Sequence, residues 1–217
     1  MPIHLMNVTA PSSKLRFVCF RAITCKIWLL IAGCLWAPIS DAEDLPTAND
    51  AFERGEYVTA LELYETLAGQ GNAEAQFQVG LMYEQGLGTD VDRQTAQRYY
   101  QQAAEQRSPQ ALDALGTLYL KGEGVIQNFK ESLRLFQQAA AQGYPQAQHN
   151  LGVAYADGKG TFRDPVKAHM WFNLASANGY PQAAASRERL ASSMAQSEIA
   201  RAQDNAMKCA DRGYVGC

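Results

Sequence analysis

Apolar and small residues recur at helical spacing along most of the chain. The first clear segment begins at Ala73 and stops at a glycine pair, and its apolar face consists of Phe77, Gly80, Leu81 and Tyr83. A second segment starts after Asp92, a short polar residue of the kind that accepts hydrogen bonds from the free N–H groups at a helix amino terminus. The pattern therefore predicts pairs of short helices joined by glycine-containing turns.

The second helix of each pair mixes small residues with aromatic ones. In the first pair these are Ala96, Tyr99, Tyr100, Ala103 and Ala104, and in the third pair they are Ala168, Trp171, Phe172 and Ala175. Small residues beside large ones let neighbouring helices approach closely and interlock. We therefore expect the aromatic side chains to form a core rather than a cofactor site.

The pattern repeats with a period of 36 residues. The recurring positions include Gly80, Gly116 and Gly152, then Tyr83, Tyr119 and Tyr155, and the turn glycines Gly86/Gly88, Gly122/Gly124 and Gly158/Gly160. A repeat of this length is typical of a solenoid, in which each unit buries its apolar face against its neighbours.

These units resemble the Sel-one-like repeat, a relative of the tetratricopeptide repeat. The third unit carries the motif in Ala147, Leu151, Gly152, Tyr155, Gly158, Gly160, Asp164, Ala168, Trp171 and Gly179. The resemblance implies an all-α, right-handed solenoid of about five helical hairpins. Its three full repeats are expected at residues 72–107, 108–143 and 144–179.

Both ends of the repeat array depart from the motif. Residues 43–71 keep the second-helix pattern, but a short turn at 54–56 replaces the two-glycine turn, as in a tetratricopeptide-like first hairpin. In residues 180–217, Glu188 and Ala191 stand where the motif has glycine and tyrosine. We expect this segment to form a capping hairpin, with its second helix over about 196–212, because an open solenoid end exposes apolar surface.

Residues 1–42 have the features of a signal peptide. Four basic residues precede the uncharged run 27–37, and the small-x-small sequence 40–42 predicts cleavage before Glu43. The run is shorter than the roughly 20 apolar residues that a membrane span needs. A periplasmic or secreted location is expected. One alternative is a lipoprotein whose lipid anchor is attached at Cys34, and another is a buried amino-terminal helix.

Cleavage there leaves 15 basic and 21 acidic residues, a formal net charge of −6. An acidic body without a clustered basic face argues against binding nucleic acid or an anionic membrane. Cys209 and Cys217 are the only cysteines that remain, which predicts a disulfide in an exported chain. Their spacing does not match a zinc site, and we expect no metal.

The sequence predicts no catalytic site and no cofactor. His149 and His169 form no HExxH pair, and the chain has neither S-x-x-K nor G-x-S-x-G. The Gly-Lys-Gly sequence at 158–160 lacks the spacing of a phosphate-binding loop, and its glycines recur in every repeat. The alternative function is a hydrolase of cell-wall or β-lactam compounds, because cysteine-rich members of the resembled family have been linked to such compounds.

The resemblance to tetratricopeptide proteins implies that the first helices line a concave groove. In this register the expected partner-binding residues are Glu74, Phe77, Leu81, Glu84, Asp113, Thr117, His149 and Val153, with Gln110, Leu120, Gln146 and Ala156 beside them. A mixture of apolar and acidic groups suits a peptide-binding groove, although it also suits a merely solvated face. We therefore expect an exported scaffold that binds a protein or peptide partner.

Overall fold

The computed structural model describes residues 41–217. Residues 1–40, which contain nearly all of the predicted signal peptide and Cys34, lie outside the described part. The helices are α1 (Asp41–Glu53), α2 (Tyr57–Gly69), α3 (Ala73–Gln85), α4 (Arg93–Glu105), α5 (Pro109–Lys121), α6 (Phe129–Ala140), α7 (Pro145–Asp157), α8 (Pro165–Ala177), α9 (Pro181–Ala191) and α10 (Gln196–Asp211). This part of the chain contains no strand.

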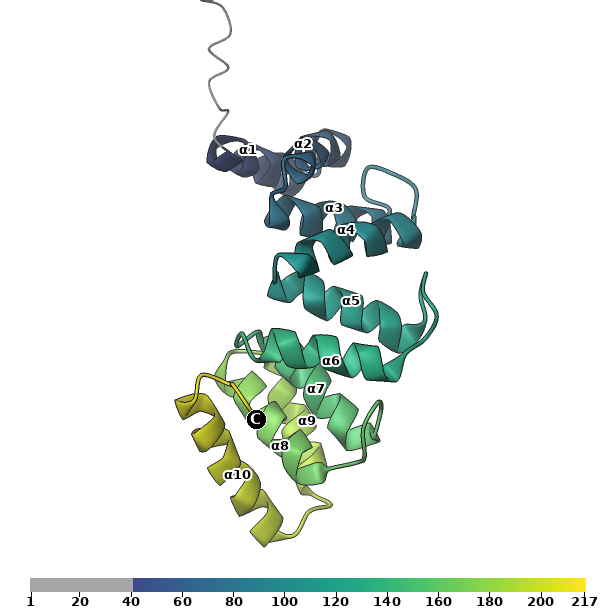
Figure 1. Cartoon of the computed structure of the whole chain (residues 1–217). Helices are drawn as coiled ribbons and strands as arrows, with labels where there is room; N and C mark the ends of the chain where they lie inside the picture. Colours follow the sequence, from purple (N-terminus) through teal and green to yellow (C-terminus); the bar gives the residue numbers. More distant parts are fainter. Residues whose placement is uncertain (1–40) are drawn as a thin grey trace, which may run out of the picture. The chain divides into compact units, whose positions relative to one another are not determined.

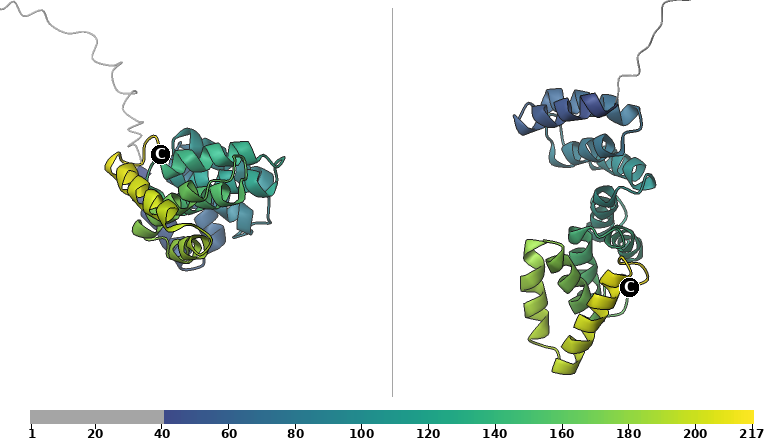
Figure 2. Two further views of the ribbon diagram at one scale, coloured as in Figure 1. Left: turned by 90° about the horizontal axis from the view of Figure 1, so that it is seen from below. Right: turned by 90° about the vertical axis from the view of Figure 1, so that its left-hand side faces the viewer.

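The first eight helices pack as four successive hairpins. The pairs are α1 with α2, α3 with α4, α5 with α6 and α7 with α8, and each second helix also packs on the first helix of the next pair (Figure 1). Successive hairpins turn relative to one another along the stack (Figure 2). The all-α repeat solenoid expected from the sequence is confirmed.

Polar caps and turn glycines set the helix boundaries in each repeat. The side chains of Asp92, Asn128 and Asp164 accept hydrogen bonds from backbone N–H groups in the first turns of α4, α6 and α8. At the other end, Gly86, which follows α3, adopts the left-handed conformation with φ 72°. A side chain is disfavoured in that conformation, so glycine ends the helix there at little cost.

The repeated glycines at the middle of the first helices allow close helix contact. A Cβ atom added to Gly80 would lie 2.7 Å from the Tyr100 ring, and one added to Gly152 would lie 2.6 Å from the Phe172 ring. Both aromatic rings are buried. The close approach that the period predicted at Gly152 is therefore present, and the aromatic residues of the second helices belong to the core.

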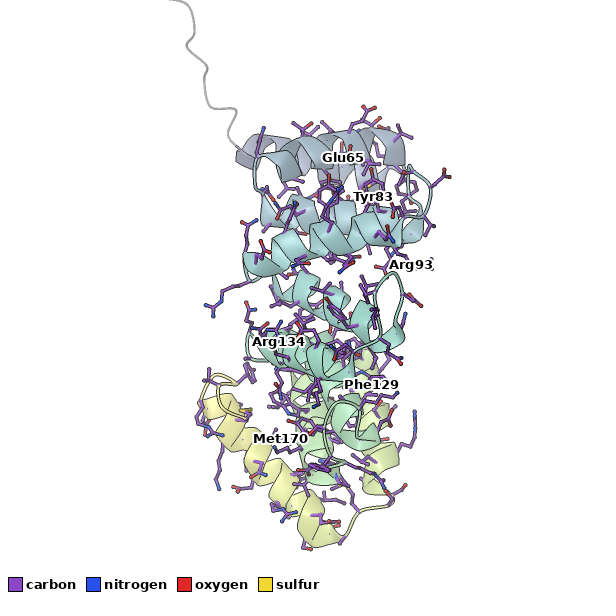
Figure 3. All side chains as sticks on the ribbon, turned by 45° about the vertical axis from the view of Figure 1, so that its right-hand side comes forward. Glu65, Tyr83, Arg93, Phe129, Arg134 and Met170 are labelled. Atoms are coloured by element: carbon purple, nitrogen blue, oxygen red, sulfur yellow. A yellow bond between two sulfur atoms is a disulfide. The ribbon has the colours of Figure 1, made fainter. Side chains whose placement is uncertain are left out.

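The repeat tyrosines connect one hairpin to the previous one. The Tyr83 hydroxyl of α3 donates a 2.9 Å hydrogen bond to Glu65 of α2 (Figure 3). Two periods later, the Tyr155 hydroxyl of α7 accepts a 3.5 Å hydrogen bond from Gln137 of α6. The Tyr83–Glu65 hydrogen bond, together with burial, raises the pKa of Tyr83 to about 12. Both contacts join the first helix of one hairpin to the second helix of the hairpin before it.

The last two helices differ from the capping hairpin expected over 180–217. Both helices are present, but α9 and α10 each pack on α8 instead of on each other (Figure 1). Glu188 occupies the position of the close-contact glycine in α9 and is exposed, so no second helix covers α9 at that position. Instead α10 buries Ala202, Ala206 and Cys209.

A disulfide between Cys209 and Cys217 closes the carboxyl-terminal tail against α10, with a Cα–Cα distance of 5.6 Å. Within this loop the Tyr214 hydroxyl donates a 3.1 Å hydrogen bond to Asn178, at the end of α8. The Tyr214 ring lies against Gly143, at the turn between α6 and α7. The carboxyl-terminal tail therefore contacts α10, the end of α8 and the turn between α6 and α7. No helix within residues 41–217 is both long and apolar enough to cross a membrane.

Candidate binding surface

The expected partner-binding residues lie on α3, α5 and α7, at matching positions of the repeats. Phe77, Asp113 and His149 occupy one position, and Leu81, Thr117 and Val153 occupy another. The half-buried members of the expected set are Glu74, Phe77, Leu81, Glu84, Thr117, His149 and Val153, together with Gln110, Leu120 and Ala156. Gln146 is exposed and Asp113 is buried. Because nearly all of the other residues are half-buried, the surface is more closely packed than an open groove.

On α3, two of these residues are already engaged in packing. The Phe77 ring lies 5.8 Å from the Tyr100 ring of α4, measured between centroids. Glu84 accepts a 2.6 Å hydrogen bond from the Tyr100 hydroxyl. Burial, assisted by this bond, raises the pKa of Tyr100. Glu74 accepts a hydrogen bond from Gln78 of the same helix, while Leu81 lies half-buried one turn beyond Phe77.

Asp113 links α5 to α7 from a buried position. It is only 3% exposed, and its carboxylate accepts a 2.8 Å hydrogen bond from the Asn150 side chain. Burial raises the pKa of Asp113 to about 7, against the opposing effect of the Asn150 hydrogen bond. Asp113 therefore offers a partner almost no surface, although the sequence register placed it among the binding residues.

His149 links α7 to α9 in the same way. Its Nε2 atom lies 3.0 Å from the Ser186 hydroxyl oxygen. The imidazole centroid lies 5.3 Å from that of Phe172 and 4.9 Å from that of Tyr180. Burial lowers the pKa of His149, which favours the uncharged form of the ring.

The Asp113–Asn150 and His149–Ser186 contacts are the same contact one repeat apart. In each, a residue of one first helix bonds a residue 37 positions later, on the next first helix. Sequence analysis identified Asp113 and His149 but missed Asn150 and Ser186. The 36-residue period could have identified them. When the first helices stack in register, a residue lies close to the residue 37 positions later, on the next first helix.

A histidine bonded to a serine is also part of many hydrolase sites. In such sites a third group orients the imidazole through its other nitrogen. Here His149 Nδ1 is buried and has no hydrogen-bond partner in the described part of the chain. Since the period accounts for the contact, the geometry favours a packing role. Residues 45–217 also contain no cluster of three His, Cys, Asp or Glu side chains that would hold a metal ion.

The repeats match a known family. The Sel1 repeat profile matches residues 73–108, 109–144 and 145–180, which cover the three pairs from α3 to α8. These bounds lie one residue after the units expected from the sequence. No curated protein matches the chain significantly.

Solved structures share the fold. A Sel1 repeat protein from Oxalobacter formigenes matches with a TM-score of 0.64 and 25% identity, over 77% of this chain and 80% of that one. The protein c5321, a protective antigen of uropathogenic Escherichia coli strains with an SLR fold, matches with a TM-score of 0.56 and 22% identity. That match covers 80% of this chain and 47% of c5321. With three profile matches and this architecture, the chain belongs to the Sel1 repeat proteins.

Proposed function

We propose that the chain is an exported scaffold that binds a protein or peptide partner on the surface formed by α3, α5 and α7. The observation that supports this is a contrast between two kinds of position on the same helices. Gly80, Gly116 and Gly152 are identical and each contacts an aromatic ring of the following helix. A neighbouring surface position differs in every repeat, with leucine, threonine and valine at 81, 117 and 153.

This contrast suits a surface that recognises an irregular partner. Packing does not require one residue type on this face, since Asp113 and His149 make equivalent contacts between first helices. The side chains at 81, 117 and 153 can therefore vary to match a partner. Differing side chains at fixed spacing present several distinct contacts on a preordered frame. Such a frame loses little conformational entropy on binding, so several modest contacts suffice for affinity.

The disulfide supports the exported location. Disulfides persist in oxidising compartments such as the bacterial periplasm and the extracellular space, and they are rare in the cytosol. The bond between Cys209 and Cys217 is thus consistent with the signal peptide predicted over 1–42.

The test compares surface variants with a control in a pull-down from the native envelope. Leu81→Arg and Thr117→Arg each place a large charged group on the proposed surface, whereas Gln101→Arg places the same group at an exposed position of α4. We expect a partner retained by the wild type and by Gln101→Arg to be lost from both surface variants. Unchanged thermal unfolding would show that the variants remain folded. A partner retained equally by all four proteins would place the binding site elsewhere.

A further inference from the structure

One edge of the solenoid carries a row of exposed apolar side chains on the loops that join the helices of each repeat. Val91 is 51% exposed, Ile126 is 90% exposed and Phe162 is 94% exposed. These three loops project from the same edge of the stack (Figure 1). Phe129, at the start of α6, lies on the same edge and is 38% exposed (Figure 3). Large apolar residues gathered in this way mark interaction surfaces.

The loops are held firmly by the preceding hairpin. A Cβ atom added to Gly124 would lie 2.8 Å from Arg93 Cβ, and one added to Gly160 would overlap the backbone carbonyl of Phe129. Each two-glycine turn therefore rests directly on the first residue of the previous second helix. Because of this contact, Ile126 and Phe162 are displayed at fixed positions.

Charge changes sign along this edge. The loop between α3 and α4 carries the exposed residues Asp90 and Asp92, which form no ion pair in the described part of the chain. In the middle loop, Glu123 lies between Arg93 and Lys121, at 3.8 and 3.9 Å, so its charge is balanced.

The opposite end of the row is basic. The loop between α7 and α8 carries Arg163, which is exposed and whose Nε atom donates a hydrogen bond to the Ala156 carbonyl. Lys130, beside this loop, is also exposed. Neither cation is paired with a carboxylate among the described residues. The third loop also contains Lys159, which pairs with Asp157, and Asp164, which caps α8, so Arg163 and Lys130 leave it only a small excess of positive charge. The edge is thus acidic at one end, apolar and balanced in the middle, and weakly basic at the other end.

We propose that a second copy of this chain docks on this edge in an antiparallel, two-fold arrangement. In a two-fold interface the same surface is used by both copies, so it must complement itself. The row does so when the middle loops meet and the first loop of each copy faces the third loop of the other. Ile126 then packs on its own equivalent, Val91 lies near Phe162, and Asp90 faces Arg163.

Other occupants fit this edge less well. A parallel pairing would place Asp90 against Asp90 and Arg163 against Arg163. An anionic membrane would attract the Arg163 end but repel the acidic end. Three loops from each copy form a small contact, and interfaces below about 1,200 Å² are typically weak. We therefore expect a dimer that forms in the micromolar range. Its contacts use none of the residues of the α3–α5–α7 surface, so the two proposals can fail separately.

The first test is sedimentation velocity of the natively expressed, processed protein over a series of micromolar concentrations. We expect a monomer–dimer equilibrium in the wild type. Ile126→Asp and Phe162→Asp should each weaken dimerisation about tenfold or more, because they place uncompensated charge in the centre of the contact. Met207→Asp is the control, since Met207 is an exposed apolar residue of α10, 63% accessible, away from this edge, and its replacement should leave the equilibrium unchanged.

A charge exchange tests the antiparallel arrangement itself. Asp90→Arg and Arg163→Asp should each weaken the dimer about tenfold, since each puts like charges opposite one another. The double variant Asp90→Arg with Arg163→Asp restores opposite charges across the two-fold axis, and it should recover dimerisation. A monomer at every concentration would overturn the proposal, as would a dimer indifferent to Ile126→Asp or a double variant no better than the singles. Binding to anionic vesicles that is lost with Ile126→Asp, without dimerisation, would reassign the edge to a membrane.

Discussion

Asp113 makes the stability of the fold depend on pH. Its pKa is about 7 in the folded protein against an ordinary value of 3.8, so between these pH values the folded state binds the proton more strongly than the unfolded state does. The free energy of unfolding therefore falls as pH rises through this window. Above it, the folded protein bears the whole destabilisation caused by burying the charged carboxylate. One unit of pKa difference corresponds to about 1.4 kcal/mol.

Asp113→Asn should remove that cost while leaving an oxygen to accept the Asn150 hydrogen bond. We expect the variant to be more stable than the wild type above pH 7, by up to about 4 kcal/mol for a pKa raised from 3.8 to about 7. The advantage should shrink toward zero near pH 4. Urea unfolding at both pH values gives the difference, and the exposed Asp90→Asn should show no such change. A variant of equal or lower stability above pH 7 would mean that the carboxylate is well stabilised in its charged form.

Gly152 tests the close contact between α7 and α8. Gly152→Ala adds a Cβ atom 2.6 Å from the Phe172 ring, and overpacking of this kind costs on the order of 1 to 3 kcal/mol. Gly69→Ala is the control, because Gly69 lies in α2 with open space around it. Because Gly69 is the last residue of α2, that control should stabilise by at most about 0.5 kcal/mol through the better helix propensity of alanine. Thermal unfolding that moves the same way in both variants would contradict the packing role.

The sequence predicted the close helix contact at Gly152 but not the burial of Asp113. This difference has a physical reason. A glycine that returns at one phase of three repeats reports a constraint that acts in each of them. A carboxylate on a first helix normally faces solvent. Only the stacking of α7 on α5, which brings Asn150 to Asp113, makes its burial tolerable.

At the scale of elements, the sequence predicted both terminal helices but not how α10 packs. The repeat pattern ends at Glu188 and Ala191, where α9 lacks the glycine and tyrosine of α3, α5 and α7. The loss of the repeat pattern does not predict which helix α10 packs on. Its position on α8 depends on apolar contacts of Ala206 and Cys209 with the core.

The disulfide should hold the tail that crosses this cap. Closing a loop of this length stabilises by roughly 2 to 3 kcal/mol at most. Cys217→Ser should therefore lower the unfolding temperature by a few degrees and release Tyr214 from Asn178. Tyr214→Phe, which deletes only the hydroxyl, should have a smaller effect. Natively expressed protein unfolded in denaturant without reductant should contain no free thiol, and two reactive thiols per processed chain would refute the bond.

At the scale of the whole molecule, the proposed export would determine the redox environment of the chain. Removal of residues 1–42 would take three of the five cysteines and leave the bonded pair, so no unpaired thiol would reach the oxidising compartment. Cleavage before Glu43 would also keep nearly all of α1, which begins at Asp41 and packs on α2. The predicted cleavage site and the first hairpin are thus compatible.

Mass spectrometry of the natively expressed protein tests this directly. We expect an amino terminus at Glu43, because the sequence 40–42 places small residues where signal peptidases need them. The control is a variant with Ala42→Arg, which removes the small residue next to the cut and should leave the precursor unprocessed. An acylated Cys34 at the amino terminus would instead make the protein a lipoprotein, tethering the repeat surface to a membrane. An intact Met1 in the cytoplasm would contradict export, and it would leave the Cys209–Cys217 bond in a compartment that keeps thiols reduced.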